Sequence, residues 1–113
     1  MISLIAHPND SIQPRRLTPA ELTNPHRVLG VDEVDVIYID ASIAMWVDAN
    51  YLDKDRDEFN AAATFLVRHY DYTFPSLRGP VLLCALRDDG TITNFTLKEA
   101  ASMHNHIHTL ANQ

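Results

Sequence analysis

The stretch Ile37–Leu52, IYIDASIAMWVDANYL, decides how the rest of the chain is organised. It contains two apolar runs, IYI and IAMWV, separated by Asp40-Ala41-Ser42, which favour a turn. Two such runs predict an antiparallel pair of strands at 34–39 and 43–47, and the second strand carries the only tryptophan, Trp46. Because the apolar character is nearly continuous, we expect at least one strand to be covered on both faces. This pair is therefore expected to lie at the centre of the core.

Composition limits both the fold and the kind of partner. The chain has 113 residues, of which 46% are hydrophobic and 21% are charged, so residues 1–113 are expected to form a single domain. Nine Lys and Arg against fifteen Asp and Glu give a formal net charge of -6. This charge repels the phosphates of nucleic acids and anionic membranes. We therefore expect no direct binding to duplex DNA.

Cysteine usage and the N-terminus indicate the compartment. A single cysteine, Cys84, excludes an intrachain disulfide and is typical of a reducing environment. Its apolar neighbours at 82–86 predict a buried thiol with a raised pKa and low reactivity. No apolar run approaches the roughly 20 residues of a membrane span, and MISLIAHPND lacks the features of a signal peptide. We expect a complete, soluble, cytoplasmic protein that makes no contact with membranes.

The N-terminal third predicts a hairpin followed by an interrupted helix. Strands are expected at 2–6 and 11–17, and Pro14 restricts the second to a sheet edge because proline has no amide donor. Thr18 as N-cap, followed by Pro19 and Glu21, predicts a helix that starts with a capping box. A proline at position 25 should interrupt that helix, and a glycine at position 30 should end it.

The polar segment 53–58, DKDRDE, should connect the central strands to a second helix at 58–70, capped by Asp57. Its acidic residues resemble the start of a calcium loop, but Glu58 stands where that loop needs glycine, and Thr64 stands where it needs glutamate. We interpret the segment as a solvated linker. Apolar residues then recur at helical spacing: Phe59, Ala62, Ala63, Leu66, Val67 and Tyr70.

The C-terminal part predicts a second hairpin and a last helix. A strand at 81–86 leads through Asp89-Gly90, a strong hairpin signal, into a strand at 91–95. Thr96 and Glu99 repeat the capping box and begin a helix that should end near Leu110. The order of elements predicts an α+β fold, with a mostly antiparallel sheet of two or three hairpins and about three helices packed on one face. The apolar face of the last helix is Ala100, Met103, Ile107 and Leu110.

Three histidines in the last helix are candidate metal ligands. His104 and His108 lie one turn apart and can share a metal ion. At about 100° per residue, His106 lies roughly 160° away around the axis and cannot join them. The motif lacks a glutamate beside the first histidine that would act as general base. The alternatives are a metal-dependent enzyme that uses His104 and His108 with a carboxylate from elsewhere, or partly exposed histidines at a subunit contact.

Arginine dominates the basic residues and points to anionic ligands. Arginine pairs with phosphate or carboxylate through two parallel hydrogen bonds, and arginines beside aromatic rings can hold a nucleotide. We select Arg68, Arg78, Trp46, Tyr51 and Tyr70 as candidate ligand-binding residues, although surface ion pairs explain the arginines equally well. Neither a phosphate-binding glycine loop nor a nucleophile elbow occurs, so no catalytic residue and no cofactor is predicted. The seven arginines are Arg15, Arg16, Arg27, Arg56, Arg68, Arg78 and Arg87.

Four short motifs carry a family resemblance: MWVDANYL at 45–52, NAAAT at 60–64, RGPVLL at 78–83 and DDG at 88–90. Together they resemble a family of small uncharacterised proteins from bacteria and their phages, over residues 34–95. The longer DKDRDE link departs from that pattern, and the last helix lies outside it. The family has no established reaction, so the resemblance assigns no catalytic residue. It implies a small accessory protein that binds and blocks rather than turning over a substrate.

These observations predict a non-enzymatic accessory binding protein of phage or mobile-element type, acting in the host cytoplasm. Its partner would be a nucleotide-like signal that it sequesters or a host defence protein that it blocks. A homo-oligomer is expected through the sheet edge or the last helix, because small domains gain stability from association. A further alternative is an acidic mimic of nucleic acid, which requires these residues to share one face: Asp32, Glu33, Asp35, Asp53, Asp55, Asp57 and Glu58.

Overall fold

The computed structural model describes residues 1–53 and 58–111, and strand β5 (Val81–Leu86) runs through the middle of its sheet. β5 pairs antiparallel with β1 (Ser3–Ala6) on one side and with β4 (Ile43–Asp48) on the other. Five of its six residues are buried, because both faces of the strand are covered. The remaining strands are β2 (Ile12–Arg15) beyond β1, β3 (Val34–Asp40) beyond β4, and the short β6 (Ile92–Thr93), which pairs with the end of β5.

The predicted hairpin of β3 and β4 is confirmed, and β4 lies in the core as expected, but the expected central place is wrong for β3. Val36 pairs with Trp46, and the turn at 40–42 joins the strands. In the order β2-β1-β5-β4-β3, however, β3 is an edge strand. The unbroken apolar run of β5 takes the central place because a central strand needs apolar side chains on both faces. β2 lies at the opposite edge, where Pro14 was expected.

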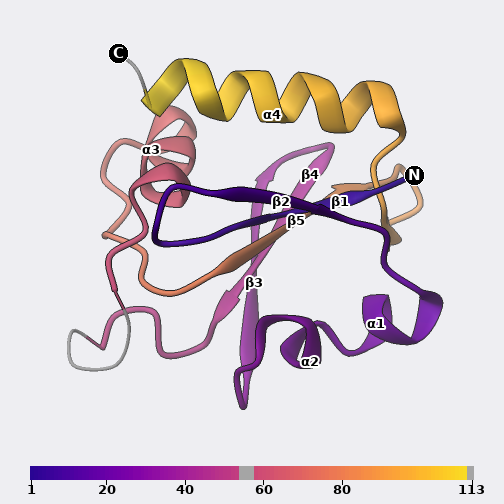
Figure 1. Ribbon diagram of the computed structural model, residues 1–113, viewed down its shortest axis with the longest axis horizontal. Coiled ribbons are helices and arrows are strands. Elements are labelled where there is room, and N and C mark those ends of the chain that lie inside the picture. The colour runs from indigo at the N-terminus through magenta and orange to yellow at the C-terminus, as the bar shows by residue number, and fades with distance from the viewer. Residues whose placement is uncertain (54–57, 112–113) are drawn as a thin grey trace.

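Helices cover both faces of the sheet (Figure 1). α3 (Ala61–Tyr70) and α4 (Leu97–Ala111) lie on one face, and the short helices α1 (Pro19–Thr23) and α2 (Pro25–Leu29) lie on the other. The α+β class and the antiparallel sheet are confirmed. The structure differs from the expected one-sided packing because successive strand residues point to opposite faces, and both faces of β5 are apolar.

The sheet consequently separates two apolar cores. Leu83 belongs to the larger core, beneath α3 and α4, whereas its neighbour Leu82 belongs to the smaller core, beneath α1 and α2. In β1, Leu4 and Ile5 divide in the same way. Cys84 lies in the smaller core and is fully buried, as predicted, and this burial raises its pKa to about 11.

Most of the predicted helix boundaries are confirmed, and the start of the helix predicted at 58–70 is corrected. Thr18 and Glu21 form a capping box, and Gly30, at φ 70°, ends α2 in the left-handed conformation that glycine adopts readily. The helix predicted at 58–70 begins instead at Ala61, with Asn60 as its N-cap. Asp57, the predicted cap, lies outside the described residues. The Asn60 amide also donates to the backbone of two other segments, which the local sequence does not reveal.

The last hairpin and the last helix form where they were predicted. Gly90 occupies the turn at φ 86°, although β6 has only two residues because Asn94 leaves the ladder and turns its amide to the Leu17 backbone. Thr96 and Glu99 form the second capping box at the start of α4. Among residues 1–53 and 58–111, no helix is both long enough and apolar enough to cross a membrane.

Candidate functional site

A cavity of about 430 Å³ lies beside α4, where this helix faces the β3–β4 turn. Its size is typical of sites for small molecules. Residues 98, 102 and 106 follow one another at single-turn spacing and therefore line one side of the helix. Its floor is formed by the buried apolar side chains of Ile43, Phe95 and Met103. The polar or aromatic side chains of the walls are Ser42, Tyr70, Lys98, Glu99, Ser102 and His106.

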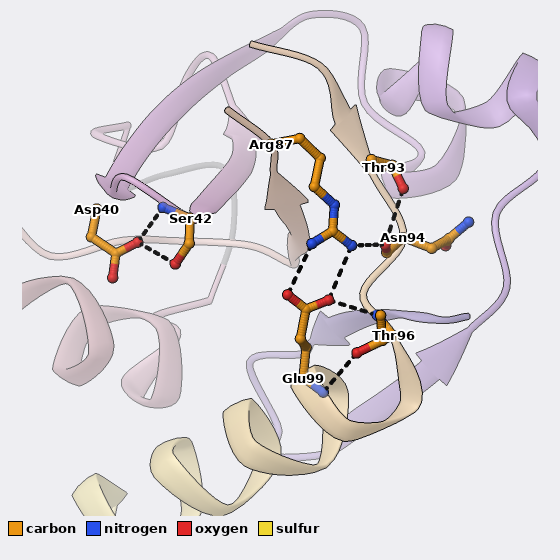
Figure 2. A network of polar contacts seen from close by, with 7 residues as sticks. All are labelled: Asp40, Ser42, Arg87, Thr93, Asn94, Thr96 and Glu99. Atoms are coloured by element: carbon orange, nitrogen blue, oxygen red, sulfur yellow. Dashed lines mark hydrogen bonds and ion pairs between the residues drawn. The ribbon is translucent and has the colours of Figure 1, made fainter. Parts of the chain in front are cut away.

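Glu99, which lines the cavity near the start of α4, forms an ion pair with Arg87 (Figure 2). The two terminal nitrogens of Arg87 donate to the two carboxylate oxygens of Glu99 at 2.9 and 3.0 Å. Nη2 of Arg87 also donates to the carbonyl of Asn94 at 3.3 Å, and Glu99 accepts from the Thr96 amide at 2.8 Å. The hydrogen bonds from Arg87, and then that from Thr96, lower the pKa of Glu99 to about 2. Glu99 is therefore a paired carboxylate at neutral pH.

The β3–β4 turn forms the wall opposite α4. The Oδ1 atom of Asp40 accepts from the amide of Ser42 at 2.7 Å and from its hydroxyl at 2.9 Å, as Figure 2 shows. The carbonyl of Ser42 accepts from the Leu86 amide at 2.9 Å, so the turn is fastened to the end of β5. These hydrogen bonds stabilise the turn.

The rings of His106, Tyr70 and His69 lie close together, and the first two line the cavity. The centroid of His106 lies 5.0 Å from that of His69 and 6.3 Å from that of Tyr70. Desolvation, and then the nearby charge of Asp40, raises the pKa of Tyr70, so its hydroxyl keeps its proton at neutral pH. The Nε2 atom of His106 is buried and has no hydrogen-bond partner among the described residues. Such an atom is uncommon, because buried polar atoms in folded proteins are nearly always paired.

The structure does not bring the five predicted ligand-binding residues together. Tyr70 lines the cavity. The rings of Tyr51 and Phe74 stack at 6.2 Å, and Arg68 donates to the Phe74 carbonyl at 2.9 Å. Trp46 belongs to the smaller core, on the opposite face of the sheet.

The remaining arginine of that set, Arg78, forms an isolated β-bridge with Phe59. Arg68 donates to Ser76 as well, at 3.1 Å, so this guanidinium holds the 74–76 segment in place. The alternative interpretation of the arginine content, surface ion pairs, applies to Arg15 and Arg87, which pair with Glu21 and Glu99. Only Tyr70 of the predicted five borders the cavity.

Sequence reasoning missed the α4 side of the cavity. The signal was available, because Lys98, Ser102 and His106 recur at intervals of four beside the apolar face of the predicted helix. No pattern in the sequence indicated that Ser42 would line the same cavity, because this depends on how the β3–β4 turn packs against α4. The predicted separation of His106 from His104 and His108 is confirmed: the first lines the large cavity, and the other two line a different hollow.

That second hollow, of about 270 Å³, is where a metal site was considered. Asp10, from the turn between β1 and β2, lines it together with His104 and His108. Within the described residues, no group of three His, Cys, Asp or Glu is arranged to hold a metal ion. Residues 54–57, which include most of the calcium-like segment, lie outside the described residues.

The acidic face required of a nucleic-acid mimic is visible only in part. Asp32, Glu33 and Asp35 are exposed at the start of β3. Asp55 and Asp57 lie outside the described residues, so the shared face stays a prediction.

Comparison of the chain with family models, with curated proteins and with solved structures finds no significant match. The role of the cavity beside α4 is therefore inferred from its shape, its charges and its hydrogen bonds.

Proposed function

We propose that the chain is a non-enzymatic accessory binding protein that holds a small nucleotide-like ligand in the cavity beside α4. One observation carries this proposal: a cavity of about 430 Å³ beside α4 combines the apolar side chains of Ile43, Phe95 and Met103 with the rings of Tyr70 and His106.

The shape and chemistry of the walls support a ligand with an aromatic ring. Tyr70 and His106 offer ring surfaces at one end, and the floor of Ile43, Phe95 and Met103 is apolar. Mostly apolar pockets with a few placed polar groups are typical of small-molecule sites. A nucleobase combines flat apolar faces with a polar edge, so it suits these walls.

The polar groups of the cavity favour binding over turnover. Glu99 is held ionised by Arg87, with a pKa of about 2, and a general acid or base needs a pKa near the working pH. The Ser42 hydroxyl is engaged with Asp40 in its own turn. The phage or mobile-element setting comes from the four short motifs described above. In that setting, the protein would counter a host defence by removing a nucleotide-like signal from the cytoplasm.

Filling the cavity tests this function directly. Ser102 lines the cavity and is exposed on α4, whereas its neighbour Ala101 is exposed on the same helix and does not line it. We expect native mass spectrometry of the untagged protein, incubated with a metabolite extract, to show one bound small molecule. Ser102→Trp should lose that mass, and Ala101→Trp should keep it. A bare wild-type protein would contradict the proposal, and the same spectra count the subunits of the expected homo-oligomer.

Occlusion of a basic host surface is a second candidate, favoured by one observation. β3 is an edge strand with exposed acidic side chains at Asp35 and Asp40. Edge strands can pair with a strand of another protein, and the negative charges would select a basic partner. In this case, Asp35→Lys should abolish capture of a host protein and leave small-molecule binding unchanged.

A further inference from the structure

We infer that the open edge of β3 binds a short, extended, basic segment of a partner protein, which joins the sheet as an additional strand. This inference rests on the second candidate function, occlusion of a basic host surface, and names the part of the partner that is bound. Occlusion alone needs only a charged surface on a folded partner. An added strand needs no more than a peptide with a suitable pattern of residues.

The outer side of β3 presents backbone groups that an added strand can pair with. The carbonyl of Glu33 accepts from the Ala49 amide at 3.0 Å, so Glu33 directs its backbone towards β4. Alternate residues of an antiparallel strand direct both backbone groups to the same side, so Val34, Val36 and Tyr38 direct theirs outwards. Among residues 1–53 and 58–111, no strand pairs with that outer side. The edge therefore offers both donors and acceptors to another chain.

The opposite edge of the sheet is protected in a way that β3 is not. β2 has four residues, and one of them is Pro14, which has no amide to donate. β3 has seven residues and contains neither proline nor lysine. Short length, proline and lysine are common means by which edge strands avoid pairing with other chains. The irregularity between Tyr38 and Asp40 limits the regular stretch of this edge to 34–38.

The net charge of the chain is concentrated beside this edge. Residues 28–53, which include β3 and β4, contain six Asp or Glu and no Lys or Arg, whereas the rest of the chain contains nine of each. Four of these acidic residues are exposed on β3 or just before it: Asp32, Glu33, Asp35 and Asp40. Opposite charges stabilise paired strands, and like charges facing each other destabilise them. The edge therefore favours a basic segment and disfavours the β3 strand of a second copy.

A hollow between β3 and α3 provides a place for one apolar side chain of the added strand. Its volume is about 120 Å³, and its lining includes Ile37 and Ile39 of β3 and Val67 and Tyr70 of α3. Sites for small molecules are mostly about 300 Å³ or larger, so this hollow suits a single side chain better. Asp35 points to the same face of the sheet as Ile37, because side chains two residues apart share a face. A partner with a basic residue two positions from an apolar one matches both features.

The charged residues around the hollow agree with a basic partner. Asp71, directly after α3, also lines it. The arginine of α3, Arg68, donates to the Phe74 carbonyl at 2.9 Å and to the Ser76 hydroxyl at 3.1 Å. Its guanidinium is thus bound to the 74–76 segment. A lysine or arginine of the added strand would bring positive charge to a region that otherwise has more carboxylates than cations.

Fluorescence anisotropy with labelled peptides tests this inference on the untagged protein. The probe is a seven-residue peptide with blocked ends, in which lysine, an apolar residue and lysine alternate with threonines. The apolar residue is varied among leucine, isoleucine, phenylalanine and tyrosine. We expect at least one peptide to bind, and its counterpart with glutamate for lysine to bind at least about tenfold more weakly. No binding of any lysine peptide up to about 1 mM would overturn the inference.

Methylation of alternate peptide amides tests whether the bound peptide forms a strand. A strand directs only every second amide to its neighbour. One peptide therefore carries methyl groups on its threonine amides, and a second carries them on the amides of the lysines and the apolar residue. We expect one of these peptides to lose binding and the other to retain it. Loss in the first indicates an antiparallel strand and loss in the second a parallel one, whereas equal effects would exclude an added strand.

Variants of the protein distinguish this inference from occlusion alone. Asp35→Lys should weaken peptide binding at least about tenfold. Asp88→Lys, the same change in the exposed turn between β5 and β6, is the matched control and should bind the peptide normally. Capture of a folded host protein that depends on Asp35, with no peptide bound, would leave the second candidate function standing and overturn the added strand. Peptide binding without any captured host protein would support this site and contradict occlusion.

Discussion

Asn60 and His106 show two opposite uses of a buried polar side chain. The amide nitrogen of Asn60 donates to the carbonyls of Ala6 and Gly79, at 3.0 and 2.8 Å, and its oxygen accepts from the Ala63 amide at 3.1 Å. Every polar atom of this side chain thus holds the backbone together. The Nε2 atom of His106 has no such partner among the described residues. The fold therefore depends on the hydrogen bonds of Asn60, whereas the Nε2 atom of His106 contributes none among the described residues.

Replacing Asn60 with alanine should destabilise the protein strongly. The substitution removes the N-cap of α3 and leaves two buried carbonyls without their donor, so we expect a loss of about 2–4 kcal/mol in the free energy of unfolding. Urea denaturation measures this loss. Asn105→Ala, at an exposed position of α4, is the matched control and should change stability by no more than about 0.5 kcal/mol. Equal stability of the two variants would contradict the structural role of Asn60.

At the scale of elements, two helices begin in the same way. Thr18 and Glu21 form the capping box of α1, and Thr96 and Glu99 form that of α4. In each case the glutamate also pairs with an arginine, Arg15 for the first box and Arg87 for the second. The capping box thus stabilises the first turn of the helix, and the ion pair with arginine links that turn to the end of a strand. At α4, the paired Glu99 also lines the cavity.

The Arg87–Glu99 pair should contribute stability that depends on pH. The pKa of Glu99 falls from 4.5 to about 2 on folding. Its contribution is therefore complete above about pH 4.5 and is lost as the pH falls towards 2. The carboxylate side chain is 38% exposed, so solvent screening keeps the contribution below about 1 kcal/mol.

Thermal unfolding of the wild type and of Glu99→Gln measures this pH dependence. The wild type should be the more stable protein near pH 7, and the difference should shrink by about pH 3 and disappear below the folded pKa. Glu33→Gln, at an exposed position near β3, controls for the loss of one negative charge. A difference in stability that stays constant from neutral to acidic pH would exclude this linkage.

Most helices and strands were predictable from residues close together in the sequence, whereas the N-cap of α3 and the composition of the cavity depend on contacts between distant residues. The strands, both capping boxes and the Gly30 stop follow from residues that lie next to one another in the sequence. The N-cap of α3 does not follow from the local sequence. Asn and Asp both cap helices well, and the carbonyls to which the Asn60 amide donates are 54 and 19 residues away in the sequence. For the site, the sequence indicated Tyr70 but not His106, because their meeting requires α3 to pack on α4.

At the scale of the whole molecule, the sheet has two buried faces with different roles. The face under α3 and α4 carries the larger core and the cavity. The face under α1 and α2 carries the smaller core, which includes Trp46 and Cys84. The one-sided arrangement expected from the order of elements would have left this second set of apolar side chains in water. The broken helix at 19–29 covers it instead.

Adjacent substitutions in β5 separate the two faces. Leu82 and Leu83 are both fully buried and point to opposite cores, so each substitution by alanine should cost about 2–5 kcal/mol in urea denaturation. Tyr38→Ala, at a side chain that is 60% exposed on β3, should cost far less. A near-neutral Leu82→Ala would show that α1 and α2 do not cover a true core.

The same pair connects the fold to the proposed ligand. Leu82 faces away from the cavity, so Leu82→Ala should bind the ligand with wild-type affinity at temperatures where it stays folded. Leu83 belongs to the core that also includes Phe95 and Met103 of the cavity floor, so Leu83→Ala should loosen that floor and weaken binding. Calorimetry on both variants checks this difference. Equal losses of affinity in the two variants would mean that binding depends on the stability of the whole protein. That result would contradict the proposal that the cavity is the binding site.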